Sequence, residues 1–519
     1  MSAFWIKCFQ LIACFALLII LHEGGHFFFA KLFKTRVSKF YMFFNPQFVL
    51  FRCKKVDGKW RFRFLAPNVP EAVVVQTDVN GEPLKDDKGN ALLRSMTDEE
   101  RAALPEGDWR REPDNTEYGL GWVPLGGYCQ IVGMIDETQN AKNMASESKP
   151  YEFRSKTVWQ RFLVMVGGVL VNFVLALGIY AAILYTWGRD VIPMKNIEKG
   201  FSYNAMAQDL GFEDGDLPVK IDGEVIAFWD VNVYRSISTA KCVTVLRDGR
   251  EVNIDMPAGG VNLLEMLEQE PRFLSANVPA VLDSVMEHTP AYEAGLRKGM
   301  RLVAIDGEEV TWWSDFDDIM GRRADILLSD CSHEDSVRLR TITLAYRTTE
   351  EATDSLTALV DTVTLTLGED YRFGFVKKHY ATYYDVEHLD YGLLESIPAG
   401  ISFGWETMKD YVSDLRYLFS KKGAQSVGSF GTIGNLFPAT WDWQSFWSIT
   451  AFISLILAFM NIIPIPGLDG GHILFLLVEA VTRRQPSERF MEIAQYAGMI
   501  LLLGLMCLAL FNDFVKFVL

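Results

Sequence analysis

The uncharged stretch FLVMVGGVLVNFVLALGIYAAILYTW, from Phe162 to Trp187, decides what kind of fold this chain can adopt. A helix of about 20 apolar residues crosses the roughly 30 Å hydrocarbon core of a bilayer, so this stretch is long enough to span a membrane. Residues 443–468 and 493–512 also carry no charge. The sequence therefore predicts a polytopic α-helical membrane protein.

A fourth apolar segment, Ala3–Ala30, differs because it contains the ionisable residues Lys7, His22, Glu23 and His26. A signal peptide is the simpler explanation for an apolar N-terminus. This run, however, is too long for one and has no small-residue cleavage site. We therefore expect four transmembrane helices, at about 3–30, 160–187, 444–468 and 491–515.

Four spans place residues 31–156 and 469–490 on one side of the membrane and residues 188–443 on the other. The first loop has 20 Lys and Arg residues, whereas the loop 188–443 has 24 over roughly twice the length. Because basic loops are usually cytoplasmic, residues 188–443 are predicted to be extracytoplasmic. The net charge of −16 argues against nucleic acid as a partner.

The segment His22-Glu23-Gly24-Gly25-His26 is an H-E-x-x-H motif inside the first span. On a helix its two histidines lie on one face and can bind one Zn²⁺, while Glu23 can act as the general base of a metalloprotease. Ionisable residues inside a membrane segment are costly and usually functional. The alternatives are a polar helix interface or an ion path through a metal-binding or transport protein.

A catalytic zinc ion needs a third protein ligand and an open position. His22 and His26 lie at the end of the first helix that faces residues 31–156, and the third helix ends on that same side. There the chain contains Asn461, then Pro464 and Pro466, then Asp469 and His472. We favour Asp469 as the third ligand, because its carboxylate otherwise lacks a partner, and keep His472 as the competitor.

The pair of motifs, H-E-G-G-H and N-x-x-P-x-P-x-L-D-G-G-H, resembles the site-2 family of intramembrane zinc metalloproteases. Further resemblance lies in Thr116–Tyr128, Phe153–Lys156, Gly168–Asn172 and, with departures at Phe430 and Thr432, Gly428–Gly434. The most similar subgroup is the bacterial regulator of sigma-E protease, a protease that carries tandem PDZ domains.

The resemblance implies His22, His26 and Asp469 as Zn²⁺ ligands and Glu23 as the base. It implies that the protein cleaves single-span membrane proteins, such as anti-sigma factors or leftover signal peptides, in the bacterial inner membrane and in contact with lipid. It also implies a re-entrant β-hairpin formed by residues 40–51 and 122–132. The residues predicted to bind substrate are Asn461, Pro464, Pro466, Gly126 and Gly127.

Residues 188–443 contain an internal repeat. Gly211–Glu224 and Gly295–Glu308 match in one register, with glycines and the Ile-Asp-Gly-Glu turn at the same places. The pattern is typical of PDZ domains, so we expect two of them, of α+β class. Such domains bind peptide C-termini in a groove, and a size filter against bulky substrates is the alternative role. Besides a metalloprotease and a metal-binding or transport protein, a third hypothesis for the whole chain is a PDZ scaffold without catalytic activity.

The resulting organisation has nine parts. They are the first span (1–30), the loop with the hairpin and a charged insertion (31–156), the second span (157–187), the first PDZ domain (188–270), the second (271–385), an amphipathic segment (386–443), the third span (444–468), a cytoplasmic loop (469–490) and the fourth span (491–519).

Overall fold

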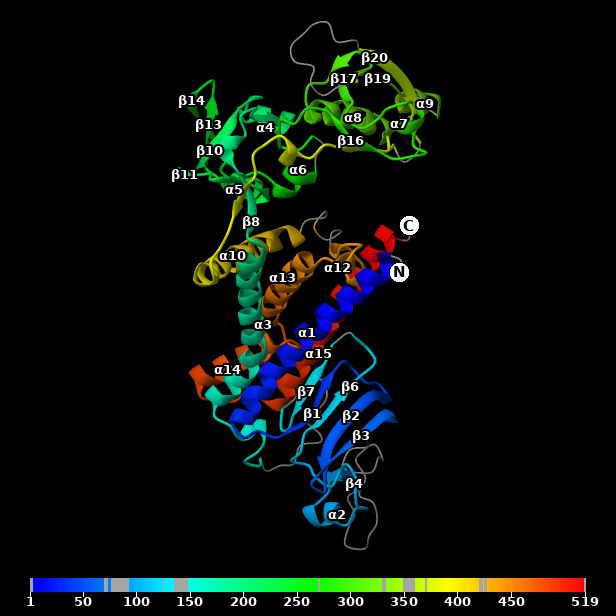
Figure 1. Ribbon diagram of the computed structural model, residues 1–519. Coiled ribbons are helices and arrows are strands. Elements are labelled where there is room, and N and C mark those ends of the chain that lie inside the picture. Colours follow the sequence, from blue (N-terminus) through cyan, green and yellow to red (C-terminus); the bar gives the residue numbers. More distant parts are fainter. Residues whose placement is uncertain are drawn as a thin grey trace. The chain divides into compact units, whose positions relative to one another are not determined.

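A computed structural model describes most of the chain and divides it into two compact units, Met1–Trp187 with Asp390–Leu519, and Gly188–Leu389 (Figure 1). The described residues are 3–69, 73–75, 93–124, 126–134, 148–268, 271–328, 333–348, 360–368, 371–419, 423 and 427–517. The charged insertion spans residues 51–115, and its residues 70–72 and 76–92 lie outside these ranges.

Within the described residues, four helices are long and apolar enough to cross a membrane, and they lie where the sequence predicts the four spans. They are α1 (Ala3–Leu32), α3 (Val158–Trp187), α13 (Trp443–Ile462) and α15 (Glu488–Phe517). The third helix ends earlier than predicted because Pro464 cannot continue it. The cytoplasmic loop predicted at 469–490 contains a further helix, α14 (Asp469–Thr482).

The second span, α3, is the centre of the first unit. It contacts α1, α13, α14 and α10 (Leu393–Asp414), and Figure 1 shows α1 and α13 beside it. Ala176, Tyr180 and Ile183 of α3 pack with Ala451 and Leu455 of α13 in one buried cluster. Small side chains on α3 let these helices approach closely, as is usual for helix pairs in membranes.

The amphipathic segment forms α10 and the short helix η5 (Leu415–Phe419). Gly400 of α10 lies directly against the backbone of Ala181 on α3, and Gly404 lies against Leu177. One face of α10 is thus packed in the bundle, while Leu394, Ile401 and other apolar side chains of the helix stay exposed. The helix is therefore amphipathic, as the sequence predicts for this segment.

The described part of residues 31–156 contains one five-stranded sheet with the strand order β3-β2-β6-β1-β7. The predicted antiparallel pairing of residues 40–51 with 122–132 is present between β1 and β7, while β6, which is parallel to β1, lies between β1 and β2. A hydrophobic pattern predicts strands but not this non-local pairing. The strands are β1 (Val37–Met42), β2 (Phe48–Val56), β3 (Lys59–Pro67), β6 (Glu117–Leu120) and β7 (Tyr128–Ile131).

The sheet is fixed to the end of α1 that carries the histidines. The ring of Phe27 packs edge-on against Phe40 of β1 and Tyr118 of β6. The edge strand β7 also contacts α1. The remaining short elements of this region are β4 (Val73–Val75), β5 (Leu93–Ser95), α2 (Asp98–Ala102) and η2 (Phe153–Ser155).

The second unit repeats one strand arrangement. Its described residues contain two four-stranded sheets, β11-β10-β13-β14 and β18-β17-β19-β20, which have equivalent strand orders. The bulge between Pro218 and Lys220 in β10 recurs between Leu302 and Ala304 in β17, 84 positions further on. The structure therefore confirms the internal repeat, while the assignment of both copies to PDZ domains stays a prediction.

The elements of this unit follow the repeat. The first part has β8 (Arg189–Pro193), η3 (Met194–Asn196), β9 (Phe201–Tyr203), α4 (Ala205–Asp209), β10 (Leu217–Ile221), β11 (Glu224–Val225), β12 (Phe228–Trp229), α5 (Val231–Thr239), β13 (Cys242–Arg247), β14 (Arg250–Asp255) and α6 (Leu263–Glu268). The second has β15 (Leu274–Ala276), β16 (Leu282–Val285), α7 (Pro290–Glu293), β17 (Arg301–Ile305), β18 (Glu308–Glu309), α8 (Trp313–Leu328), α9 (His333–Arg340), β19 (Thr341–Arg347), β20 (Asp361–Thr366), β21 (Phe375–Lys377), η4 (Tyr380–Thr382) and β22 (Glu387–Leu389).

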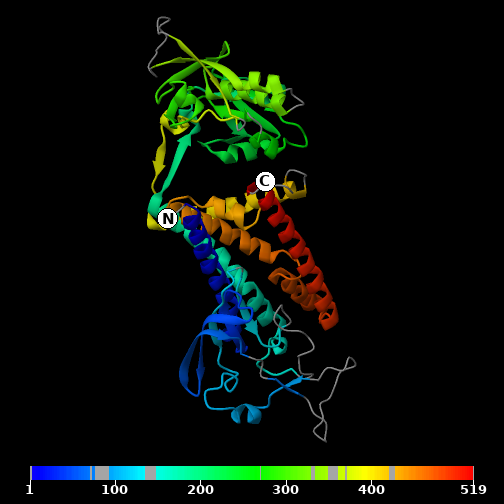
Figure 2. The same cartoon turned by 90° about the vertical axis from the view of Figure 1, so that its right-hand side faces the viewer.

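The last span, α15, is attached to the rest of its unit through a buried carboxylate. In the apolar 18-residue stretch of α15, 11% of the residues are buried, against 39% in the corresponding stretch of α3. The helix runs along the side of the other helices (Figure 2). Asp513 accepts hydrogen bonds from the N–H and hydroxyl of Ser429, from the N–H of Gly431, and from the N–H and hydroxyl of Thr432. Asp513 thereby caps α12 (Phe430–Leu436) and joins it to α15.

Replacing this carboxylate should loosen α12. In Asp513→Ala five donors lose their acceptor, and a hydrogen bond to a charged group contributes about 1.5–3 kcal/mol. Amide exchange of residues 427–436, followed by mass spectrometry in detergent, should accelerate by at least about tenfold. Lys516→Ala on the same helix is the control and should leave exchange unchanged. Equal exchange rates in Asp513→Ala and the wild type would contradict this role.

Candidate active site

The two histidines of the H-E-x-x-H motif lie one turn apart on α1, as the helical spacing predicts. Their rings are 4.8 Å apart between centroids and nearly perpendicular. His26 Nδ1 lies 2.8 Å from the main-chain oxygen of Val164 on α3. Because a carbonyl oxygen can only accept, Nδ1 carries the proton and Nε2 keeps a free lone pair.

Asp469 completes the group, and it comes from a part of the chain more than 400 residues away. Its side chain is the first of α14, directly after the Pro464–Pro466 connector. A Cβ on Gly470 would lie within 3 Å of the backbone of Ile462 and Ile463, and one on Gly471 within 3 Å of the backbone of Ile465 and Pro466. The glycines of the Leu-Asp-Gly-Gly-His motif thus allow the tight turn that presents Asp469 to α1.

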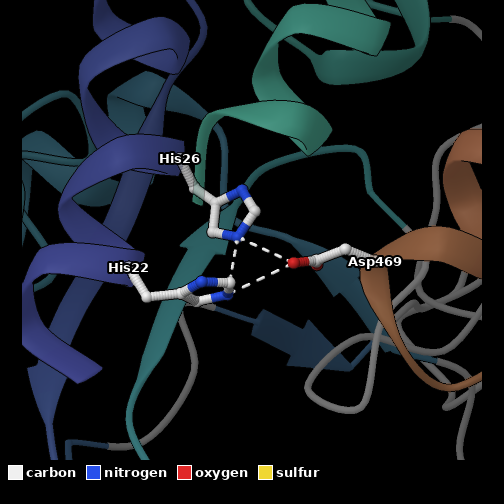
Figure 3. Close-up of side chains that lie close together, drawn as sticks. All are labelled: His22, His26 and Asp469. Atoms are coloured by element: carbon white, nitrogen blue, oxygen red, sulfur yellow. Dashed lines mark hydrogen bonds and ion pairs between the residues drawn. The ribbon is translucent and has the colours of Figure 1, made fainter. Parts of the chain in front are cut away.

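The three side chains converge on one point (Figure 3). His22 Nε2 and His26 Nε2 are 3.2 Å apart, and Asp469 Oδ2 lies 3.2 Å from the first and 3.3 Å from the second. Oδ2 is buried and has no hydrogen-bond partner among the described residues. Three ligand atoms held about 2.0–2.1 Å from a tetrahedral ion would be about 3.3–3.4 Å apart, so the arrangement fits a metal site.

Among the described residues this is the one cluster of three potential metal ligands. His472, the competing ligand, is not in it. Its Nε2 lies 3.3 Å from Nε2 of Gln495 on α15. The chemistry of two imidazoles and a carboxylate suits a divalent transition metal better than Ca²⁺ or Mg²⁺, which prefer oxygen ligands.

Glu23 shares a cavity of about 230 Å³ with the three convergent side chains. Its carboxylate accepts a hydrogen bond from the main-chain N–H of Cys129 in the edge strand β7. The general base predicted from the sequence therefore lies beside the cluster, between α1 and the sheet. Tyr128 also lines the cavity, and burial raises the pKa of its phenol, which donates to Asn45.

The residues predicted to contact substrate divide into two sets. Asn461 and Gly127 line the cavity, whereas Gly126, Pro464 and Pro466 are not among its lining residues. A Cβ on Gly126 would meet the ring of Phe44. The two prolines instead shape the connector that holds Asp469. The substrate-binding roles of these residues remain predictions.

Sequence reasoning did not assign roles to the α3 residues beneath the histidines. A Cβ on Gly168 would lie 2.4 Å from His26 Nε2 and 2.7 Å from His22 Cε1. Asn172, one turn further along, has its Nδ2 3.4 Å from His22 Nδ1. The resemblance of Gly168–Asn172 to a family segment marked this stretch without a role, and the amide of Asn172 within the uncharged stretch that begins at Phe162 is a second signal.

A bundle of membrane-spanning helices with a glutamate beside a two-histidine, one-carboxylate cluster defines a membrane metalloprotease. Comparison with known proteins agrees. The family model described as Peptidase family M50 matches residues 10–74 and 107–505. The chain therefore belongs to peptidase family M50 and is a metalloprotease of the site-2 type.

Curated relatives cover most of the chain. The Regulator of sigma-E protease RseP of Salmonella typhimurium is 27% identical over 433 residues, which cover 78% of this chain and 89% of the relative. The Escherichia coli protein of the same name is 28% identical over 440 residues, with coverages of 78% and 89%. The Regulator of sigma E protease of Haemophilus influenzae is 27% identical over 450 residues, with coverages of 79% and 89%.

Gly168 offers a test of the close approach. Gly168→Ala should push the two imidazoles away from Asp469, because the new methyl group occupies the space of their rings. We expect the metal content of the purified protein, measured by plasma mass spectrometry, to fall at least severalfold. Gly178→Ala on the same helix is the matched control, because a Cβ there meets no atom within 4 Å. Full metal content in Gly168→Ala would contradict the geometry.

Proposed function

We propose that His22 Nε2, His26 Nε2 and Asp469 Oδ2 bind Zn²⁺ and that this site hydrolyses peptide bonds in membrane-spanning segments. The observation that carries the proposal is the near-equilateral triangle of ligand atoms, 3.2–3.3 Å on a side, with Glu23 in the same cavity. Two histidines with one carboxylate, leaving a fourth position open, is a typical ligand set of catalytic zinc.

The bound ion would polarise the scissile carbonyl and lower the pKa of the attacking water towards about 7. Glu23 would take a proton from that water on its carboxylate and pass it to the leaving amine. The N–H of Cys129, which donates to Glu23, holds the carboxylate in place for both transfers.

The substrates are proposed to be single-span membrane proteins. A helix must unwind before its backbone can reach a zinc ion, and extended backbone then needs hydrogen-bond partners. The amide of Asn461 and the chain at Gly127 line the cavity and are suitably placed to supply them. Gly126, Pro464 and Pro466 are proposed to contact the substrate outside this lining. The strand β7 lies at the edge of the sheet and is a second candidate surface for such strand addition.

The names of the relatives suggest the biological setting. Two relatives carry the name Regulator of sigma-E protease RseP. We therefore propose an anti-sigma factor, or leftover signal peptides, as substrate classes. The basic residues of the loop 31–156 favour a cytoplasmic location for the sheet and an extracytoplasmic location for Gly188–Leu389, in the bacterial inner membrane. The repeated sheets of that unit would be PDZ domains that bind peptide C-termini or exclude bulky substrates.

The role of Glu23 can be tested by substitution. Glu23→Gln keeps the shape of the side chain but cannot accept the proton of water, so cleavage should fall by at least about 100-fold with zinc content unchanged. The measurement is cleavage of a single-span membrane protein in vesicles containing the purified, zinc-loaded enzyme. Glu406→Gln, at an exposed position on α10, is the control. Cleavage by Glu23→Gln at the wild-type rate would refute the proposal.

The identity of the third ligand can be tested separately. Asp469→Ala removes a vertex of the triangle, and the zinc dissociation constant should rise by at least about 100-fold, since a ligand contributes more than the 10–100-fold of an outer-shell partner. His472→Gln should leave that constant within about threefold of the wild type. The reverse order of effects, in a chelator competition assay, would assign the ligand to His472 instead.

A further inference from the structure

Asn172, in the middle of α3, has a buried side-chain amide whose oxygen lacks a hydrogen-bond partner among the described residues. The residue is 1% exposed, and the unpartnered atom is Oδ1. Its Nδ2 points at Nδ1 of His22 from 3.4 Å. A polar atom buried in a membrane helix without a partner is costly, so the arrangement calls for a functional explanation.

The backbone at Asn172 is fixed by a contact with α13. The main-chain oxygen of Asn172 accepts a hydrogen bond of 2.8 Å from Ser454 on α13, which is itself fully buried. The position of the amide between α1, α3 and α13 is therefore fixed, while the orientation of its end group can change by a half-turn about the Cβ–Cγ bond. That half-turn exchanges the oxygen and the nitrogen without moving the helix.

The two orientations have opposite effects on His22. When Nδ2 faces the ring, Nδ1 has to accept, and in the neutral imidazole the proton then sits on Nε2, where it blocks the metal-binding lone pair. When Oδ1 faces the ring, Nδ1 donates and Nε2 is free. His26 has no such choice, because its Nδ1 faces the main-chain oxygen of Val164.

Resting on the proposed zinc site, we propose that Asn172 is a positioning residue, whose side-chain oxygen accepts the Nδ1–H of His22 and fixes the tautomer that binds the metal through Nε2. The helix α3 thus supplies the outer hydrogen-bond acceptor of both histidines, a backbone carbonyl for His26 and a side-chain amide for His22. Such outer-shell acceptors typically change metal affinity by about 10–100-fold.

The test compares an acceptor with an apolar group of similar size. Asn172→Leu removes the acceptor, and the zinc dissociation constant, measured by chelator competition in detergent, should rise by about 10–100-fold. Asn172→Asp offers only acceptor oxygens and should bind zinc at least as tightly as the wild type. Thr450→Val is the matched control, because it also replaces a fully buried polar side chain by an apolar one, here on α13. It should leave the zinc dissociation constant unchanged.

The outcomes separate the possible failures. A wild-type protein that binds no zinc would refute the proposed metal site itself. Equal affinities in the wild type and Asn172→Leu would refute the role of Asn172 alone. So would an Asn172→Asp variant as weak as Asn172→Leu, since a packing role would not depend on an acceptor. If Asn172→Leu does not fold, Asn172→Thr, whose hydroxyl is one bond shorter, should show the same weakening.

Discussion

The close crossing of α1 and α3 is the constraint on which the site depends. At Gly25 and Gly167 the two backbones come so near that a Cβ on either would lie within 3 Å of the opposite carbonyl oxygen. The missing side chains at this crossing, and at Gly168 beside it, bring α3 directly under the histidines of the H-E-x-x-H motif. Only at this separation can α3 place hydrogen-bond partners on the far side of both imidazole rings.

The apolar surroundings raise the importance of every polar contact. Backbone and side-chain groups in a membrane protein must find partners inside the protein. The buried ion pair between Arg161 of α3 and Glu479 of α14, with 2.5 Å between Nη2 and Oε1, ties the helix that carries Asp469 to the helix beneath the histidines. Asp513 serves α15 in the same way at the opposite end of the bundle. These contacts hold separate helices in register around the cluster.

Local patterns predicted the site better than the fold around it. The spacing of His22 and His26, and the shared membrane side of Asp469, follow from helix geometry and from the parity of the spans, so the sequence sufficed to nominate them. The sheet order could not be predicted, because the pairing of β1 with β6 joins residues about 80 positions apart and depends on tertiary contacts. The helix α14 was missed because it is too short to count as a span. The place of Asn172 beside His22 depends on a helix crossing angle that no local pattern encodes.

X-ray absorption at the zinc edge of the purified protein tests the central claim most directly. The account predicts one zinc ion per chain, bound by nitrogen and oxygen atoms at about 2.0–2.1 Å, with outer-shell scattering from two imidazole rings. A sulfur neighbour at about 2.3 Å, scattering from three imidazoles, or a protein without zinc would contradict the assignment of His22, His26 and Asp469.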